Sequence, residues 1–305
     1  MLYHRRFLAP AVRGALVMAA LVVWQARPLP QQSDQRSLNL VDLFETDAAH
    51  AGKAEAEIKP VHTTVNSVPK VPPGTEHVPL EIRVGLISQK PVRGFWPGRN
   101  VRCHTHGGEL IPAQQLGTTV GSLHHQTIQC TGGPVQINQQ RYLGDVTLLK
   151  SQRDWLAVIS LDLESYVASV VGAEMPSQWH QEALKAQAVA ARSYALAHLA
   201  RPATAAYHLG DTTRWQVFSG ETSTSQASRS ATWETRGIIL SYGGGIVESL
   251  YASNAQVSAE AHGHLGASMS QTGAQRLADQ GWSFNAILGR YYTGASLARL
   301  KRHDQ

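Results

Sequence analysis

The feature that most constrains this fold is the stretch over 170–194, which reads VVGAEMPSQWHQEALKAQAVAARSY. Just before it, apolar residues recur at helical spacing, which predicts a helix over 162–171 with one buried face. Asp162 can cap the start of this helix, and Gly172 suits its end because it lacks a Cβ. The stretch therefore begins on a helix that we expect to end near Gly172.

A link and a second helix follow. Pro176 cannot continue a helix interior, and it biases Met175 toward an extended conformation. Ser177 can cap a second, alanine-rich helix over about 177–199, whose small side chains allow neighbouring helices to approach closely. The link contains one acid, Glu174. We therefore expect Glu174 at a tight corner between two rigid helices, which is the placement that a catalytic group requires.

The composition indicates a globular protein with an anionic partner. With 305 residues, 43% of them apolar and 16% charged, the chain can bury a sizeable core. Its formal net charge of +5 favours an anionic polymer or a membrane surface. No dense run of Lys and Arg with interleaved aromatic residues occurs, so we expect no nucleic-acid partner.

The first 26 residues are typical of an export signal. An arginine-containing start precedes an apolar stretch over 15–24, which is too short for a clear membrane span. Cleavage after Ala26 and an uncleaved anchor are both open, because Trp24 fits the small-residue cleavage pattern poorly. Either outcome predicts an exported protein in the periplasm or cell envelope, with a membrane contact only through this segment.

Two cysteines, Cys103 and Cys130, suit an oxidising compartment, where they can close one disulfide loop. Free thiols are one alternative. A metal site, as in a metal-dependent hydrolase, is another, because four histidines flank the pair: His104, His106, His124 and His125. The spacing matches no zinc pattern, so we expect no metal and no other cofactor.

Strand and helix patterns divide the remainder into a linker and one α+β domain. Residues 27–80 are polar and poorly periodic, which is typical of a linker, and the domain is expected over 81–300. The predicted strands of its mainly β part, 81–160, lie at 81–87, 127–130, 135–137, 145–149 and 155–159. The predicted elements of its helix-rich core, 161–300, add helices over 228–235, 270–280 and 283–292 and a β-hairpin of 238–242 with 246–251. This segregation indicates an α+β class rather than alternating α/β.

Several separated motifs resemble the stage II sporulation protein D family of cell-wall enzymes, which includes amidase-enhancer proteins. The run over 159–196, ISLDLESYVASVVGAEMPSQWHQEALKAQAVAARSYAL, resembles the central motif of that family. DTTRWQVFSG, over 211–220, is similar to its D-x-x-x-x-Q-x-[YF]-x-G element, and the run from Met269, MSQTGAQRLADQG, resembles its C-terminal signature. The resemblance covers about residues 81–300. It implies a lytic transglycosylase that acts on peptidoglycan glycan strands, with Glu174 of the AEMP element as the catalytic acid.

The residues themselves fit this chemistry. Cleavage of a glycosidic bond needs a proton on the leaving oxygen, and most glycosidases pair the donor with a second carboxylate. A lytic mechanism can use one residue as acid and then as base, because a hydroxyl of the sugar itself attacks. Between residues 165 and 210 the only acids are Glu174 and Glu182, and Lys185 lies one turn after Glu182. Glu182 is therefore expected in a solvated ion pair, while a surface or capping role is the alternative for Glu174.

A catalytic acid also needs a raised pKa, which an apolar pocket provides. Val170, Met175 and Trp179 are candidates for that pocket, whereas a nearby helix N-terminus would lower the pKa of Glu174. The candidates for glycan contacts are Gln187, Arg192, Tyr194, Gln216, Ser270 and Gln271. Arg192 can bind a carboxylate bidentately, with a salt bridge to a neighbouring loop as its alternative. The two amides Gln216 and Gln271 can bind sugar hydroxyls or serve as structural groups.

Two departures from the family pattern affect the expected substrate groove. The family has a Ser-x-x-x-Gly-Gly turn and then a long segment containing tryptophan, whereas here residues 253–256 lead within a few residues into HGHLGASMSQ. The family's Gly-His-Gly-x-Gly element is replaced by GHLGAS over 263–268, with Leu265 in place of the histidine. Part of the groove is therefore expected to be missing or rebuilt. The alternative function is a non-catalytic peptidoglycan-binding or amidase-activating module with a cell-wall amidase as its partner.

Overall fold

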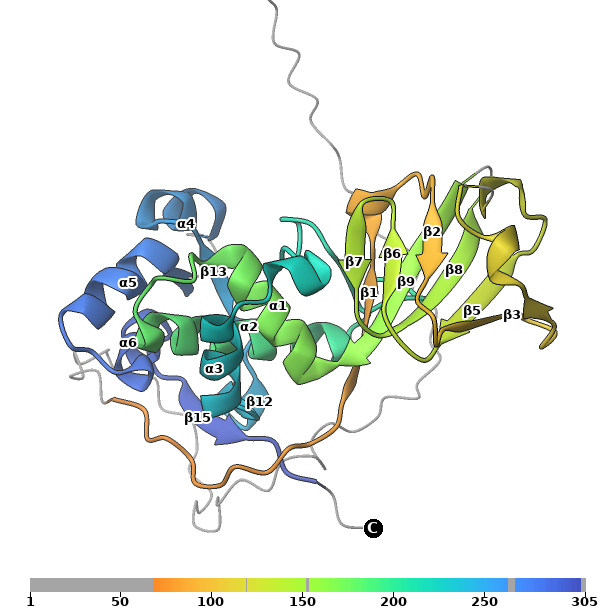
Figure 1. Ribbon diagram of the computed structural model, residues 1–305. Helices are drawn as coiled ribbons and strands as arrows, with labels where there is room; N and C mark the ends of the chain where they lie inside the picture. Colours follow the sequence, from red (N-terminus) through yellow and green to blue (C-terminus); the bar gives the residue numbers. More distant parts are fainter. Residues whose placement is uncertain (1–67, 119, 152–153, 263–266, 303–305) are drawn as a thin grey trace, which may run out of the picture. The chain divides into compact units, whose positions relative to one another are not determined.

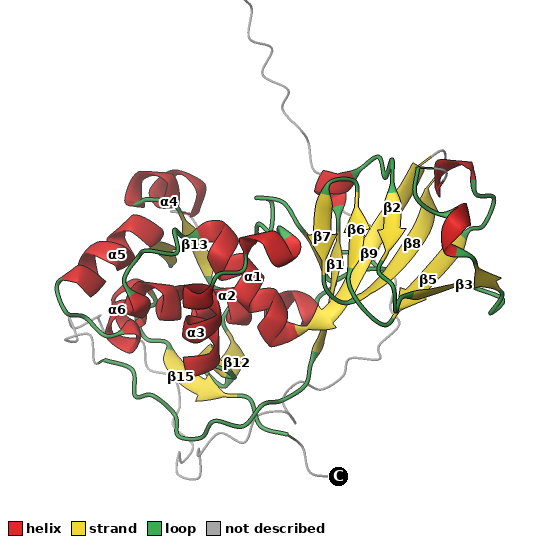
Figure 2. Cartoon of the chain, viewed as in Figure 1, coloured by secondary structure: helices red, strands yellow, loops and turns green. Residues whose placement is uncertain are grey.

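The computed structural model describes residues 68–302, apart from 119, 152–153 and 263–266 (Figure 1). The expected export segment, most of the predicted linker and the altered motif at 263–266 lie outside the described residues. Within the described residues, no helix has the length and apolar character that crossing a membrane requires. Helices and several sheets build this part of the chain, which confirms the α+β class (Figure 2).

A seven-stranded sheet forms the larger part of the β region, in the order β10-β1-β9-β8-β5-β3-β4. Its strands are β1 (Glu81–Gly85), β3 (Arg102–Thr105), β4 (Leu110–Ile111), β5 (Thr127–Thr131), β8 (Asp145–Ser151), β9 (Asp154–Asp162) and β10 (Leu209–Gly210). Strand β1 pairs antiparallel with β9 and parallel with β10, so the sheet takes up a strand from the helical part of the sequence. The core side is apolar, with Ile82, Ile128, Leu148 and Ile159 fully buried.

A smaller sheet contains β2 (Phe95–Pro97), β6 (Val135–Ile137) and β7 (Gln140–Tyr142). Short 3-10 helices lie at η2 (Ile87–Gln89), η3 (Ala113–Gln115) and η4 (Val120–Ser122). All strands predicted between 81 and 160 are present. The sequence pattern did not indicate β2, β3, β4 and β7, which are strands of two to four residues.

Cys103 and Cys130 lie directly opposite each other on β3 and β5 and form a disulfide. Both residues are buried in the core of the sheet. The disulfide prediction is therefore confirmed. Because both sulfur atoms are joined to each other, thiolate ligands for a metal at this position would first require reduction of the bond.

The helical region is built around one central helix. Its helices are α1 (Leu163–Glu174), α2 (Gln181–Ala200), α3 (Gln226–Glu234), α4 (Ala255–His262), α5 (Gln271–Asp279) and α6 (Phe284–Tyr291). Helix α2 contacts α1, α3, α5 and α6 (Figure 1). Most of α2 is buried, and the predominance of alanine on its surface lets several helices approach it at once.

The corner between α1 and α2 differs in detail from its prediction. Helix α1 does not end near Gly172 but continues to Glu174. Gly172 serves a close approach instead, because a Cβ there would lie 2.1 Å from the carbonyl oxygen of Ser223. Helix α2 begins later than expected, and its N-cap is His180 rather than Ser177. The residues between the helices form a turn closed by a hydrogen bond from Trp179 N–H to the carbonyl of Pro176, so Ser177 lies inside a turn.

The predicted hairpin is present only in its first half. Strand β11 (Ile238–Tyr242) turns through Gly243 and Gly244, whose φ values of +57° and +82° favour glycine, into β12 (Gly245–Ile246). The expected second strand then divides, because β13 (Leu250–Ala252) pairs in parallel with β14 (Ser268–Ser270) instead. The other neighbour of β11 is β15 (Ser296–Arg299). The division brings Tyr251 next to Met269, which no local pattern indicates.

The described chain begins with an extended segment over 68–80, which lies within the predicted linker. The segment is attached to the helical region by Asn285, whose side chain donates to the carbonyl of Pro69 over 2.9 Å. Arg299 donates to the carbonyl of Pro72 over 3.2 Å. The ordered packing of this region therefore starts before residue 81.

Candidate functional site

Glu174 is the last residue of α1, directly before the extended residue Met175. The buried face of α1 anchors this position through the residues that the spacing predicted: Leu163, Tyr166, Val167, Val170 and Val171. Each fully buried aliphatic side chain of this kind contributes about 1.5–3 kcal/mol. Because α1 is held by α2 and α3 along its length, the carboxyl of Glu174 stands on a rigid support.

Two hydrogen-bond donors orient the carboxylate of Glu174. The backbone N–H of Val217 donates to Oε1 over 2.9 Å, and the side-chain amide of Gln271 donates to Oε2 over 3.3 Å. Burial raises the pKa of the Glu174 carboxyl above its ordinary value, and these two hydrogen bonds lower it in part. No Lys or Arg pairs with this carboxylate within the described part of the chain. Its environment therefore favours an acid that keeps its proton to a higher pH than a solvent-exposed glutamate.

Glu174 faces a cavity of about 340 Å³. The residues that line it are Glu174, Tyr194, Thr213, Arg214, Trp215, Ser249, Leu250, Tyr251, Ala252, Ser253, Val257 and Gln271. Glu174 is the only carboxylate among them, and the apolar part of the lining comes from Trp215, Leu250, Ala252 and Val257. The predicted apolar candidates Val170, Met175 and Trp179 do not belong to this lining.

Gln216 lies next to the cavity and does not line it. Its amide accepts a hydrogen bond from the Tyr166 hydroxyl over 2.8 Å and donates to the Tyr251 hydroxyl over 2.9 Å and to the carbonyl of Ala191. The side chain is fully buried, so all its polar atoms serve the connection of α1, α2 and β13. Of the two roles open for Gln216, the structure places it in the structural one, next to the cavity and not in it.

Gln271 and Ser270 lie together at the start of α5 but have different roles. Gln271 reaches Glu174 and lines the cavity. Ser270 is the N-cap of α5, and its hydroxyl accepts a hydrogen bond from the N–H of Gly273 over 3.0 Å. The cap fixes where α5 begins, and in this way it positions Gln271.

Two further candidates on α2, Tyr194 and Gln187, lie in different places relative to the cavity. Tyr194 lines the cavity, with its ring 4.5 Å from the ring of His198. Gln187 lies two turns earlier, is fully buried and does not line the cavity. Neither polar atom of its amide has a hydrogen-bond partner within the described residues. The structure therefore brings Tyr194, but not Gln187, to Glu174.

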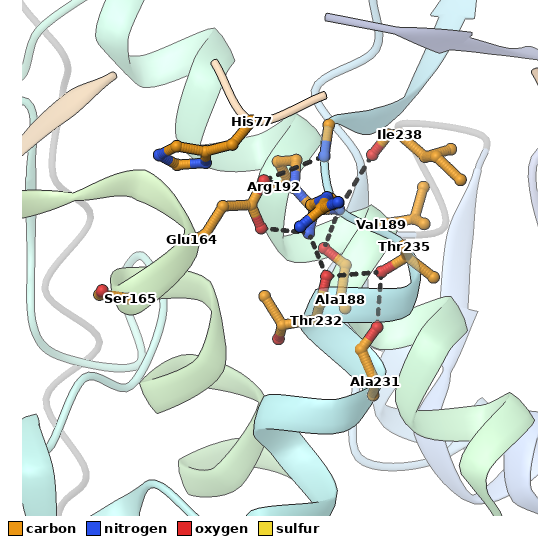
Figure 3. A network of polar contacts seen from close by, with 12 residues as sticks. His77, Glu164, Ser165, Ala188, Val189, Arg192, Ala231, Thr232, Thr235 and Ile238 are labelled. Atoms are coloured by element: carbon orange, nitrogen blue, oxygen red, sulfur yellow. Dashed lines mark hydrogen bonds and ion pairs between the residues drawn. The ribbon is translucent and has the colours of Figure 1, made fainter. Parts of the chain in front are cut away.

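Arg192 points away from the Glu174 cavity. Its guanidinium is fully buried and binds Glu164 bidentately, with Nε 3.0 Å from Oε1 and Nη2 2.6 Å from Oε2 (Figure 3). The remaining donors bind the carbonyls of Ala188, Thr232 and Ile238. Arg192 therefore forms a salt bridge, as the alternative expected, but its partner lies on helix α1 and not on a loop. Every donor is used internally, so substrate contact is not open to Arg192.

Two groups at the cavity were not among the sequence candidates. Arg214 is exposed, with its guanidinium 5.0 Å from the ring of Trp215, and Tyr251 stands on β13. Their signal was weak, because Arg214 occupies a variable position of the 211–220 motif and Tyr251 ended a presumed hairpin strand. The motif's Asp211 is buried outside the cavity and accepts hydrogen bonds from the N–H and hydroxyl of Ser88, so it ties this loop to η2.

A metal site is not apparent at the histidines that the sequence drew attention to. Within the described residues, no group of three or more His, Cys, Asp or Glu side chains could hold an ion. His264 and the other residues of the altered motif over 263–266 lie outside these residues.

Comparisons with known proteins find similarity in the region that contains the α1–α2 corner. Residues 151–242 match the family described as stage II sporulation protein. An uncharacterized protein of Brachyspira hyodysenteriae is 32% identical over 118 residues, and the match covers 38% of this chain and 32% of that protein. The amidase enhancer of Bacillus subtilis is 36% identical over 85 residues, and this match covers 28% of this chain and 11% of that protein.

The matched region runs from the end of β8 to the end of β11 and includes Glu174, Val217 and Gln216. The matches cover 32% and 11% of the lengths of the two relatives, so they concern one domain rather than whole proteins. Gln271 and the C-terminal signature lie beyond 242 and complete the site only in three dimensions. The part of the chain that carries Glu174 is therefore similar to a domain of the stage II sporulation protein family.

Proposed function

We propose that this protein cleaves the glycan strands of peptidoglycan by a lytic transglycosylase mechanism, with Glu174 as acid and then as base. One observation carries the proposal. Among its described lining residues the cavity has a single carboxyl group, which is partly desolvated, is held by two hydrogen-bond donors and has no cationic partner in the described part of the chain. A mechanism that needs two carboxylates on opposite sides of the sugar does not fit such a site.

In the first step, protonated Glu174 donates its proton to the glycosidic oxygen as the bond between this oxygen and the anomeric carbon breaks. In the second step, the C6 hydroxyl of the same muramyl residue attacks the anomeric carbon and returns its proton to the Glu174 carboxylate. The products are a shortened strand and a 1,6-anhydromuramyl end, and no water is consumed. Burial prepares the acid for the first step, and the N–H of Val217 stabilises the carboxylate that forms between the steps.

The cell-wall setting of the proposal comes from the family and from the relative named amidase enhancer. It is consistent with an exported protein located in the periplasm or cell envelope. Binding of glycan strands would place sugar hydroxyls near Gln271 and Tyr194 and an anionic group of the strand near Arg214, which has no acidic partner within the described residues.

The second candidate is a non-catalytic module that binds peptidoglycan or activates a cell-wall amidase. The name of the Bacillus subtilis relative and the shortened region before residue 262 favour it. It retains the cavity as a binding site but assigns no proton transfer to Glu174.

The experiment that separates the two uses purified protein and glycan strands from which the peptides have been removed. The enzyme releases anhydromuramyl products, detected by mass spectrometry, and the Glu174→Gln variant does not. Glu109→Gln, an exposed acid in the β region, is the matched control and keeps full activity. Strand binding without any product, from protein shown to be folded, would establish the non-catalytic module instead.

A further inference from the structure

A second cavity lies beside the N-terminal half of α1. Its volume is about 700 Å³, roughly twice that of the Glu174 cavity, and the two share no lining residue. Glu164, Ser165 and Ala168 of α1 form one side, and α3 forms another. Ten residues of helix separate Glu164 from Glu174, which corresponds to about 15 Å. The second cavity is therefore a separate site, of a size typical for small-ligand binding.

The three acidic side chains at this cavity already have partners within the protein. Glu164 pairs with the buried Arg192 at 2.6 Å (Figure 3). Glu221 pairs with Arg141 at 2.9 Å. Asp162 accepts the backbone N–H groups at the start of α1 with Oδ1, and its Oδ2 lies 3.3 Å from Nε2 of His77, which also lines the cavity. None of the three is left as a free attraction for a cationic ligand.

The cations at the same cavity are in the opposite situation. Arg229 and Arg236 have no acidic partner within the described residues. The guanidinium of Arg236 lies 3.8 Å from the centre of the Trp233 ring, and its Nε is buried without a hydrogen-bond partner in the described structure. The unbalanced charge of the cavity is therefore positive, and it favours an anion that accepts several hydrogen bonds.

Two further features restrict the anion. Trp233 is 66% exposed, so a face or edge of a large aromatic ring is open to a ligand. The hydroxyl of Thr232 is buried without a partner within the described residues, although the residue is only 3% exposed. Buried polar atoms normally have a partner, so such a group at a cavity wall suits a ligand that supplies one.

Neutral hydroxyl and amide groups make up much of the remaining wall: Ser165, Thr224, Gln226 and Ser230. Such groups match the hydroxyls of a sugar, which both donate and accept hydrogen bonds. The C–H edge of a sugar ring carries partial positive charge and packs against the negative face of an aromatic ring. A lipid chain would use the aromatic surface but has no groups that can pair with these hydroxyls.

We propose that this cavity binds a carboxylate-bearing sugar of an anionic glycan. Arg229 and Arg236 bind the carboxylate, Trp233 packs on the sugar ring, and the hydroxyl-rich wall with Thr232 binds the sugar hydroxyls. Binding here does not require Glu174 to be catalytic. In a protein that acts on glycan strands, the site would hold the strand at a point separate from the cleaved bond.

The test is a titration of the full chain with N-acetylmuramic acid and with its methyl ester, in which a methyl group removes the charge of the carboxyl group. Binding is followed by NMR at the indole N–H of Trp233. The acid is expected to bind about tenfold or more tightly than the ester, because hydrogen bonds between charged groups are the stronger ones. Equal binding of acid and ester, or no shift of the Trp233 signal, would overturn the proposal.

Matched variants locate the site. Trp233→Ala and Arg236→Gln are each expected to weaken binding of the acid about tenfold. Trp282→Ala and Arg290→Gln change an exposed tryptophan and an exposed arginine elsewhere and leave binding unchanged. Glu174→Gln also leaves it unchanged, which separates this site from the proposed active site. Loss of binding in Glu174→Gln, together with full binding in Trp233→Ala, would place the sugar in the other cavity and refute the proposal.

Discussion

Helix α1 carries two glutamates, one near each end, and the structure gives them opposite environments. Glu164 in the first turn faces the guanidinium of Arg192, which binds it bidentately. Glu174 in the last turn faces only neutral donors, the N–H of Val217 and the amide of Gln271. A cation stabilises a permanent carboxylate, whereas partial burial with neutral donors favours a group that can hold a proton and release it. The same residue type on the same helix is thus a structural anchor at one end and a candidate acid at the other.

The largest expected effect comes from removing the proton carrier. Glu174→Gln keeps the shape of the side chain and its hydrogen bond from Val217 but cannot donate a proton. We expect the release of anhydromuramyl products to fall by about 10²–10⁴-fold, the range of general acid–base catalysis. Mass spectrometry of digested strands measures the loss, and an unchanged unfolding midpoint shows that the fold is intact. If Glu174→Gln released products as fast as the parent protein, Glu174 would not be the acid that distinguishes this end of α1 from the other.

The ion pair at the other end is expected to matter for stability. Arg192→Met leaves the largely buried Glu164 without its partner, which costs about 3–5 kcal/mol of unfolding free energy. Urea denaturation measures this loss. The double variant Glu164→Gln with Arg192→Met should recover part of it, because no unpaired charge then remains. A loss below about 1 kcal/mol, the range of surface pairs, would contradict the anchoring role.

Gly172 offers a way to disturb one end of α1 more than the other. A Cβ at this position would meet the carbonyl oxygen of Ser223 at 2.1 Å, so the helix or its neighbour must move. Overpacking of this kind costs about 1–3 kcal/mol, although alanine is otherwise the better helix former. Gly172→Ala should therefore lower both the unfolding free energy and the activity. A variant more stable than the parent protein would show instead that Ser223 moves away from the new Cβ at little cost. Ala168→Gly, earlier on α1, is the control for helix propensity alone.

The smallest expected effect is a dependence of stability on pH. Burial raises the pKa of Glu174 above its ordinary value of 4.5, so the folded state holds this proton more tightly than the unfolded state. The unfolding free energy therefore decreases as the pH rises from 4.5 through the raised pKa of Glu174 in the folded state. The lost stability is not regained at higher pH. Compared with Glu174→Gln, the parent protein should be equally stable below pH 4.5 and less stable at neutral pH. Denaturation curves of both proteins across this range provide the measurement, and an opposite sign would mean that the hydrogen bonds outweigh burial.

Much of this fold could be predicted from local sequence. The stripe of apolar residues on α1, the alanines of α2 and the alternation in β1, β5, β8 and β9 each follow from the spacing of side chains along one element. Tight positions were harder to interpret. The sequence pattern predicted a helix end at Gly172, but this residue lies inside α1. Its missing side chain makes room for the carbonyl oxygen of Ser223, which is distant in sequence.

The site was predictable in part. Glu174 was indicated by its corner and by the resemblance, and Tyr194 and Gln271 do lie with it at the cavity. Arg192 was a plausible ligand for an anion until its partner was known, since an arginine on a helix shows no sign of which acid it binds. Arg214 stands at a variable position of its motif, and the splitting of the presumed hairpin strand brought Tyr251 to the cavity.

Local sequence was sufficient for the class of the fold, because this class depends on residue type and short spacing. It left the Cys103–Cys130 disulfide as one of three alternatives, and Glu174 became the candidate acid only together with the resemblance of distant motifs. The environment of that acid depends on residues much further along the chain. Val217 and Gln271 lie 43 and 97 residues from Glu174, and Arg192 lies 28 residues from Glu164. Only tertiary packing decides which donors reach which carboxylate. For that reason, the division of α1 into an anchored end and a proton-carrying end became visible in the folded protein alone.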